Sequence, residues 1–170
     1  ASVILFVGGL APHKNLSGFL DGFEKSLGNA CMRHVHVALI GDLKGAGFFS
    51  NYNSLSVKVK TNPLLAERVH FSGYVSDEDL VALYSSAFAV TMPSYSEGFG
   101  LPAIEAMACG APVLASDRGS LPEVIGDAGI YFDPFDIESI SKAIIEMAEN
   151  RNLRLQLSCN ALTRAKTFTW

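Results

Sequence analysis

Two glutamates and two glycines between positions 97 and 105 have types and a spacing that suit ligand chemistry. Glu97 stands in an expected loop, and Glu105 follows eight positions later on the first turns of an expected helix. Gly98 and Gly100 let backbone N–H groups approach a ligand closely, and Pro102 suits the first turn of a helix. Free amides and the helix dipole favour an anion there. The segment therefore predicts an anion site flanked by two carboxylates that can accept hydrogen bonds from hydroxyl groups.

A nucleoside diphosphate sugar offers the matching combination, because it is anionic in the middle and rich in hydroxyl groups at both ends. Each residue taken alone has a plainer explanation. A glutamate early in a helix is stabilised by the helix dipole by about 0.3–1 kcal/mol without any ligand, and glycines in a loop can simply make a turn. The two carboxylates together with the glycines, at one loop–helix junction, are what favour a ligand site.

The elements that must position this junction alternate along the chain. Strands are expected at 2–7, 35–40, 69–71, 87–92, 112–115 and 130–132. Helices are expected near 15–27, 50–62, 77–86, 101–109, 120–125, 136–149 and 151–167. Short apolar strands separated by helices are typical of a parallel sheet covered on both faces. The pattern predicts a Rossmann-like, three-layer α/β/α fold with about six strands, in which ligands bind beyond the carboxyl ends of the strands.

Local signals support these boundaries. Ser76 precedes the acidic run 77–79, which is typical of a helix start, and Ser120 with Glu123 matches the S-x-x-E capping box. Gly110 follows an expected helix where a C-terminal glycine belongs. No repeat or linker divides the chain, so residues 1–170 are expected to form a single domain.

Composition limits the classes of function. With a formal net charge of −4 and a pI near 5.5, the chain is not expected to bind nucleic acid. Cys31, Cys109 and Cys159 lie too far apart for a metal knuckle or a disulfide framework, which favours a reducing, cytoplasmic compartment. No run approaches the roughly 20 apolar residues of a membrane span. The chain opens on a strand-like run without a signal peptide, and it is expected to be trimmed at both ends.

Longer stretches resemble a known family. The segment 94–113, with its E-x7-E spacing, resembles the signature of retaining GT-B glycosyltransferases of the GT4 type, the glycosyl transferases of group 1. The segment 6–16 resembles the first strand and phosphate-binding lysine of that family, and 68–84 is similar to its base-binding loop. The segments 116–129 and 132–136 follow in family order. The resemblance covers essentially the whole chain and implies the C-terminal half of a GT-B enzyme.

The resemblance implies roles for individual residues. Glu97 would contact hydroxyl groups of the transferred sugar, and Lys14 would neutralise the leaving diphosphate, so these two are the catalytic candidates. A fixed cation stabilises the negative charge that a departing nucleoside diphosphate accumulates. The other candidates would bind the donor through the ribose, the sugar, the phosphates or the base: Glu105, Gly98, Phe99, Gly100, Leu101, Gly8, Gly9 and Val75.

The site is expected to need no metal and no cofactor beyond its donor substrate, a GDP- or UDP-sugar. One departure from the family stands at Gly9, where many relatives carry an arginine that also faces the diphosphate. A second cation would then come from Lys44, Lys58 or Arg118. Relatives that use GDP-mannose often lack that arginine too, which makes GDP-mannose a candidate donor.

The reaction implied for the parent enzyme is transfer of a hexose to a hydroxyl acceptor, with retention, in glycan or polysaccharide synthesis. GT-B enzymes hold the acceptor, here a glycan or glycolipid, on their first domain, and their last helix usually begins at a motif like residues 168–170. The acceptor domain and that crossing helix are therefore expected to lie outside this chain, and the chain alone is not expected to turn over. The parent enzyme would be cytoplasmic, with peripheral attachment to the inner face of a membrane left open.

Other functions are weighed against this interpretation. Residues 98–103 match the G-x-G-x-x-A fingerprint of dinucleotide-binding domains, and Asp117 could serve as the acid that binds the ribose. Residues 93–97 separate that fingerprint from its strand, however, and Glu97 would repel a pyrophosphate. Asp77 and Asp79 suggest a D-x-D metal site but fall on the expected first turn of a helix. A sugar-nucleotide epimerase and a binding module without catalytic activity remain open.

Overall fold

The computed structural model describes residues 2–42 and 50–168. Lys44, one of the three candidate second cations, and the last two residues of the 168–170 motif lie outside the described part of the chain.

A six-stranded sheet in the order β3-β2-β1-β4-β5-β6 forms the centre of the fold, and all its neighbouring strands are parallel. The strands are β1 Ser2–Val7, β2 Val35–Ile40, β3 Val69–Gly73, β4 Ala89–Met92, β5 Val113–Ser116 and β6 Gly129–Phe132. The predicted parallel sheet is confirmed, and its strands lie close to the predicted ranges.

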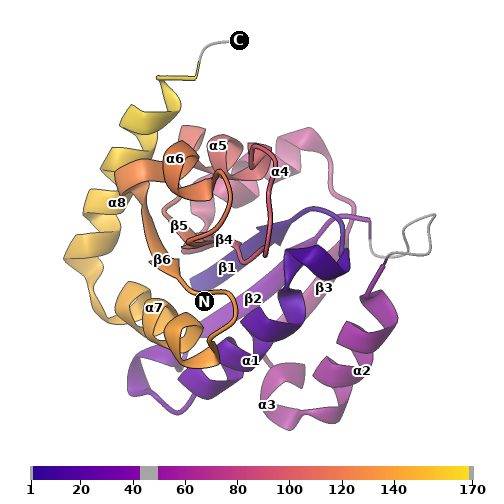
Figure 1. Ribbon diagram of the computed structural model, residues 1–170. Coiled ribbons are helices and arrows are strands. Elements are labelled where there is room, and N and C mark those ends of the chain that lie inside the picture. The colour runs from indigo at the N-terminus through magenta and orange to yellow at the C-terminus, as the bar shows by residue number, and fades with distance from the viewer. Residues whose placement is uncertain (1, 43–49, 169–170) are drawn as a thin grey trace.

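Helices cover both faces of the sheet. They are α1 Leu16–Ser26, α2 Tyr52–Thr61, α3 Pro63–Ala66, α4 Asp77–Ser86, α5 Leu101–Ala108, α6 Leu121–Ile125, α7 Ile137–Glu149 and α8 Arg151–Ala165, with short 3-10 turns at Pro12–Lys14, Ala30–Met32 and Gly126–Ala128. One layer holds α1, α2, α3 and α7, the other holds α4, α5 and α6, and α8 packs against α5 (Figure 1). The predicted three-layer fold is confirmed.

Alternate side chains of the central strand β1 enter different cores, as the two-residue period of a strand requires. Ile4 and Phe6 pack among the side chains of α1 and α7, whereas Leu5 packs on the opposite face among those of α4 and α5. All three are buried. This two-sided burial explains why β1 is an unbroken apolar run in the sequence.

The helix expected at 50–62 is confirmed as α2, and a short helix that was not predicted, α3, follows it at once. Asn62 has an extended backbone, as a residue before proline usually does. Its side-chain oxygen accepts hydrogen bonds from the amides of Leu64 at 3.0 Å and Leu65 at 3.3 Å, so it caps a new helix that begins at Pro63. Two other predicted signals are confirmed. The Ser76 hydroxyl caps α4, and Gly110 has a φ of +80° just after α5.

Gly22 lies where α1 crosses α7, and its lack of a side chain sets how closely the two helices pack. A Cβ at this position would lie 2.4 Å from Cγ2 and 2.7 Å from Cβ of Ile140, and the Cβ of Ile140 cannot rotate away. Alanine normally stabilises a helix by about 0.5–1 kcal/mol relative to glycine, but the overlap here outweighs that gain. Gly22→Ala is therefore expected to lower the free energy of unfolding by about 1–3 kcal/mol, measured by urea denaturation.

The matched control is Gly28→Ala, because a Cβ at Gly28 would meet no atom within 4 Å. Its free energy of unfolding is expected to change by less than about 0.5 kcal/mol. A Gly22→Ala protein more stable than the parent chain would show that α1 and α7 can separate without cost.

Among the described residues, no helix has both the length and the apolar character needed to cross a membrane.

Candidate functional site

The sheet order brings together two loops that are far apart in the sequence. β1 and β4 are neighbours at the centre of the sheet, and the chain continues toward β2 on one side and toward β5 on the other. Such a switch point leaves a crevice at the carboxyl ends of the two strands. The loops after β1 and β4 meet there, and the amide of Tyr95 donates a hydrogen bond to the carbonyl of His13 at 2.9 Å.

Lys14 and Glu97, the two predicted catalytic residues, are in direct contact at this switch point. The Nζ atom of Lys14 lies 2.6 Å from Oε1 of Glu97. The two side chains are 21% and 9% exposed, so the pair is partly shielded from water. Lys14 ends a short 3-10 turn, and the next residue, Asn15, has a left-handed φ of 53°. The cation and the carboxylate therefore neutralise each other in the absence of a ligand.

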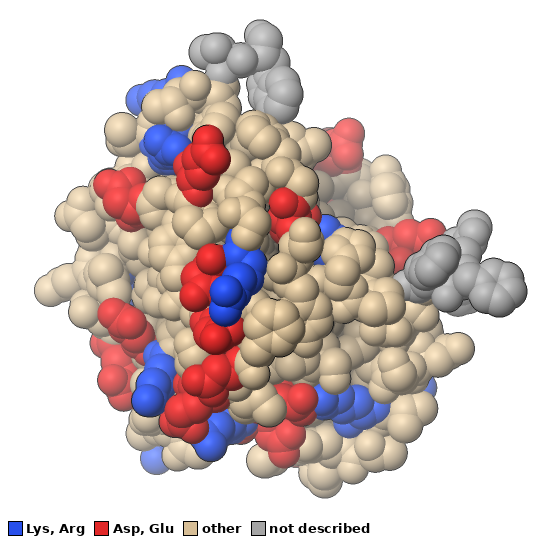
Figure 2. Space-filling model, in the orientation of Figure 1, with Lys and Arg blue, Asp and Glu red and all other residues tan. Residues whose placement is uncertain are grey.

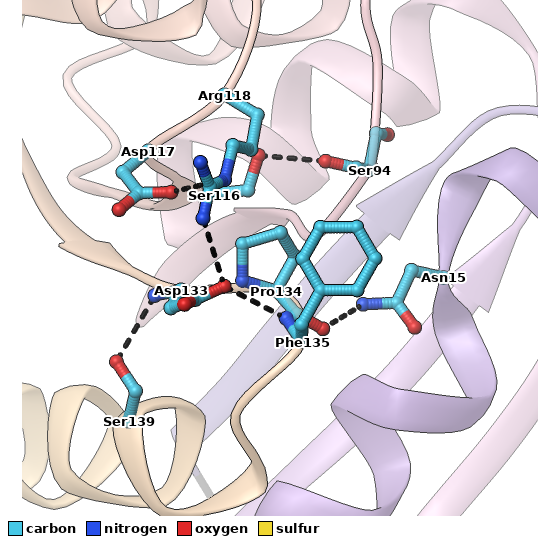
Figure 3. Close-up of polar contacts among 9 residues, drawn as sticks. All are labelled: Asn15, Ser94, Ser116, Asp117, Arg118, Asp133, Pro134, Phe135 and Ser139. Atoms are coloured by element: carbon cyan, nitrogen blue, oxygen red, sulfur yellow. Dashed lines mark hydrogen bonds and ion pairs between the residues drawn. The ribbon is translucent and has the colours of Figure 1, made fainter.

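Three serines to which the sequence analysis gave no role in the site hold Glu97 in place. The hydroxyl of the buried Ser94 donates to Oε1 of Glu97 at 2.6 Å. The Ser116 hydroxyl donates to the Ser94 carbonyl at 2.7 Å (Figure 3), and the Ser120 hydroxyl donates to the Glu97 carbonyl at 3.3 Å. The predicted capping box of Ser120 and Glu123 is therefore wrong, because Ser120 makes no side-chain cap and its hydroxyl bonds the neighbouring loop.

Ser94→Ala would leave Oε1 of Glu97 without its neutral donor in a site that water reaches poorly. Loss of one such charge-assisted hydrogen bond is expected to lower the free energy of unfolding by about 1–2 kcal/mol. Urea denaturation measures this, with Ser96→Ala as the control, because Ser96 is exposed in the same loop. Equal stability of the two variants would mean that Glu97 is not held by Ser94.

The predicted donor-binding glycines shape the start of α5. Gly100 has a φ of +75° and precedes the first helical residue, and a Cβ there would come within 3.0 Å of Leu121. Nothing lies within 4 Å of a Cβ at Gly98. Phe99 and Leu101 are nearly half exposed. In the first turn of α5, Pro102 has no N–H, and the amide of Ala103 donates to the carbonyl of Gly100 at 2.9 Å. The dipole of the helix still favours an anion at this end of α5.

Glu105, on the next turn of α5, is exposed and is held by a tyrosine that the sequence analysis missed. The hydroxyl of Tyr84, on α4, donates to Oε2 of Glu105 at 3.1 Å. Burial raises the pKa of Tyr84, and the charge of Glu105 raises it further, so the phenol stays protonated as a donor. A hollow of about 410 Å³ opens beside this pair between α4 and α5. Its lining is Asp77, Leu80, Val81, Tyr84, Glu105, Ala108 and Cys109.

The loops after β1, β2 and β3 are joined by backbone hydrogen bonds. The amide of Gly8 donates to the carbonyl of Ile40 at 2.9 Å, and the amide of Gly41 donates to that of Gly73 at 3.0 Å. Val75 lies two residues after the end of β3 and packs with the apolar cluster that contains Tyr84. These bonds hold the loops that carry Gly8 and Val75 together at the carboxyl ends of the strands. Gly9, in the first of these loops, is exposed.

Two candidate second cations are already paired with carboxylates. Lys58 lies 2.5 Å from Asp21, and Arg118 lies 3.0 Å from Asp117 and 3.3 Å from Asp133. Each would have to break these pairs to reach a diphosphate beside Lys14, so the geometry does not favour either.

The D-x-D pair occupies the acidic first turn of α4, as its helix position predicts, and the Ser76 hydroxyl donates to Asp79 at 2.7 Å. Within the described ranges, no three His, Cys, Asp or Glu side chains are grouped as metal ligands would be. That the longer enzyme needs no metal stays a prediction.

The sequence of this chain is similar to known protein families and proteins. A family model described as "Glycosyl transferases group 1" matches residues 1–164. The chain belongs to this family. It is 36% identical to O-antigen chain mannosyltransferase B of Escherichia coli, over 98% of the chain and 42% of that protein. It is 33% identical to mannosylfructose-phosphate synthase of Agrobacterium fabrum, over 99% of the chain and 37% of that protein.

Solved structures of GT-B glycosyltransferases share the fold. Sucrose-phosphate synthase from Thermosynechococcus elongatus superposes with a TM-score of 0.81 at 28% identity, over 98% of this chain and 41% of that one. Anabaena HepE in complex with UDP-glucose gives a TM-score of 0.83 at 25% identity, over 97% and 44%. The predicted resemblance to GT-B glycosyltransferases is confirmed, and the chain is a glycosyltransferase group 1 domain. It spans less than half the length of these relatives.

Proposed function

We propose that this chain is the donor-binding domain of a longer retaining glycosyltransferase, which moves a hexose from a nucleoside diphosphate sugar to a hydroxyl acceptor. The observation that carries the proposal is the contact between Lys14 and Glu97 at the switch point, in the loop that leads to the N-terminus of α5. Anabaena HepE, which shares this fold, is described in complex with UDP and with UDP-glucose. The acceptor, a glycan or glycolipid, would be held by a part of the enzyme outside this chain.

The chemistry follows from the charges at the site. When the bond between the sugar and the diphosphate breaks, negative charge builds up on the diphosphate, and Lys14 and the first turn of α5 would stabilise it. Glu97 would exchange Lys14 for the hydroxyl groups of the sugar while Ser94 keeps its carboxylate oriented. Glu105, held by Tyr84, would accept hydrogen bonds from the ribose. These groups position and stabilise, and none of them needs to form a covalent intermediate.

The hollow between α4 and α5 supports GDP over UDP as the nucleotide. With the ribose on Glu105, the base would lie in this hollow, whose lining includes the carboxylate of Asp77. A carboxylate has two acceptor oxygens, and guanine presents two adjacent N–H donors on its pairing edge where uracil presents one. Similarity to an O-antigen chain mannosyltransferase supports mannose as the sugar. GDP-mannose is therefore the proposed donor.

The test is a transfer assay on the longer protein, with Glu97→Gln as the variant and EDTA as a separate condition. We expect sugar transfer from GDP-mannose with retained anomeric configuration, loss of at least about 100-fold in kcat for the variant, and no effect of EDTA. Unchanged transfer by the variant would contradict the role of Glu97. If the unmodified longer protein transfers no sugar but epimerises the GDP-sugar, it is an epimerase. If it transfers no sugar but still binds its partner, it is a binding module.

A further inference from the structure

An exposed aromatic side chain next to the candidate site is held in one position from several sides. Phe135 follows β6, and 70% of it is exposed to solvent. Its ring stacks on that of Tyr95, with centroids 4.7 Å apart and planes 18° from parallel. The guanidinium of Arg118 lies 5.7 Å from the centre of the same ring. Tyr95, Phe135 and Arg118 together form a surface that is called here the aromatic shelf.

The backbone beneath the shelf is fixed as well. The buried side chain of Asn15 donates to the carbonyl of Pro134 at 2.9 Å, which ties the β6–α7 loop to the start of α1 (Figure 3). The amide of Phe135 donates to Asp133 at 3.0 Å, and the amide of Asp133 donates to Ser139 at 3.0 Å. Because the loop is held at both ends, Phe135 keeps its ring in solvent in the free state. Such preorganisation lowers the entropic cost of binding a ligand.

A hollow of about 440 Å³ opens beside the shelf, within the range of about 300–1,000 Å³ that is usual for ligand pockets. Tyr95, Phe135 and Ile137 form an apolar wall, whereas Ser17 and Asn51 supply polar groups among the remaining lining. A hexose has a face of C–H groups that can pack on an aromatic ring and an edge of hydroxyl groups that needs hydrogen-bonding partners. The mixed lining fits that combination better than it fits a purely apolar ligand.

The charges around the shelf favour a neutral ligand. Arg118, the cation of the shelf, is paired with both Asp117 and Asp133. Asp136 follows directly, is exposed and caps α7, and Asp21, which lines the hollow, is paired with Lys58. Acidic side chains form a band on this face of the molecule, with basic side chains beside them (Figure 2). Because Arg118 and Lys58 are already paired with carboxylates, a phosphate or carboxylate ligand would gain little here. The ligand should therefore be neutral and rich in hydroxyl groups.

The shelf adjoins the candidate donor site. Tyr95 stands two residues before Glu97, and its amide is bonded to His13, the residue before Lys14. We propose that the aromatic shelf and its hollow bind a neutral hexose unit of the acceptor glycan, at a distance from the reacting hydroxyl group. This inference rests on the proposed function, and it places part of the acceptor site on the donor-binding domain itself.

The test is an amide NMR titration of this chain with neutral trisaccharides (mannotriose, maltotriose and cellotriose) and, separately, with GDP. At least one trisaccharide is expected to shift the resonances of Tyr95, Phe135 and Ile137. Phe135→Ala is expected to weaken that binding roughly ten-fold and to leave GDP affinity unchanged, which also shows that the variant is folded. Leu155→Ala, which changes an exposed apolar residue on α8, is the control and should change neither affinity.

The two titrations separate the inference from the proposed function. If GDP binds but no trisaccharide shifts the hollow, or if trisaccharides shift only the surroundings of Glu97, the shelf is not a glycan subsite. Equal trisaccharide binding by Phe135→Ala and the parent chain would also overturn the inference. If a trisaccharide binds at the shelf but GDP binds nowhere, the sugar subsite stands and the donor-binding function fails.

Discussion

Lys14→Ala and Glu97→Gln are expected to change the affinity of this chain for GDP in opposite directions. Lys14→Ala removes the cation that would face the diphosphate, and it leaves the carboxylate of Glu97 unpaired beside it. Loss of one charged hydrogen bond costs about 1.5–3 kcal/mol, which corresponds to roughly a ten-fold to hundred-fold higher Kd for GDP. Isothermal titration calorimetry or NMR titration measures this change.

Glu97→Gln should strengthen GDP binding several-fold, because it frees Lys14 from an ion pair of 2.6 Å and removes a negative charge beside the diphosphate. GDP-mannose should gain less than GDP, since the variant also loses the carboxylate that would hold the sugar hydroxyl groups. Glu67→Gln is the control, because it changes the net charge equally at an exposed position. If Glu97→Gln weakens GDP binding as Lys14→Ala does, then the ion pair itself, and not the free lysine, forms the phosphate site.

Gly41→Ala is expected to lower the free energy of unfolding by about 2–4 kcal/mol, the sum of two independent costs. Gly41 has a φ of +138°, a region that residues with side chains avoid. A Cβ there would lie 2.3 Å from the carbonyl oxygen of Gly8 and 2.9 Å from its carbonyl carbon. Because these are backbone atoms, the clash can be relieved only by moving the loop that leads to Lys14, so GDP affinity should also fall.

Gly9→Ala is the matched control for stability, because a Cβ at Gly9 would meet no atom within 4 Å and its φ is not positive. Urea denaturation of both variants gives the comparison. If Gly41→Ala unfolds at the same urea concentration as the parent chain, the loops after β1 and β2 are not packed against each other as tightly as the structure shows.

The ranges of the strands and the loop with its two glutamates could be predicted because they depend on local patterns. The contact of Lys14 with Glu97 could not be derived from such patterns, since it follows from the order of strands in the sheet. Family resemblance named both residues but gave no geometry. The sequence analysis also missed Ser94 and Tyr84, because a hydroxyl group in a loop or helix shows no pattern that reveals its distant partner.

A missed helix and a wrong capping box have different physical causes. The start of α3 at Pro63 could have been predicted, because Asn62 precedes a proline and proline disfavours a helical backbone at the residue before it. The capping box at Ser120 could not, because its pattern is intact in the sequence. Ser120 has a helical backbone, and its hydroxyl hydrogen-bonds the carbonyl of Glu97 in a loop from another strand. A local pattern carries no information about such a competing partner.

Amide NMR of this chain can show whether the loops after β1 and β4 hold a nucleoside diphosphate sugar. The spectra would be recorded during addition of GDP-mannose, UDP-glucose and NAD in separate experiments. Saturable shifts at Lys14, Gly98 and Gly100 with GDP-mannose, weaker shifts with UDP-glucose and none with NAD are the predicted result. Shifts at these residues with NAD alone, or GDP-mannose binding that leaves all three unperturbed, would contradict the account.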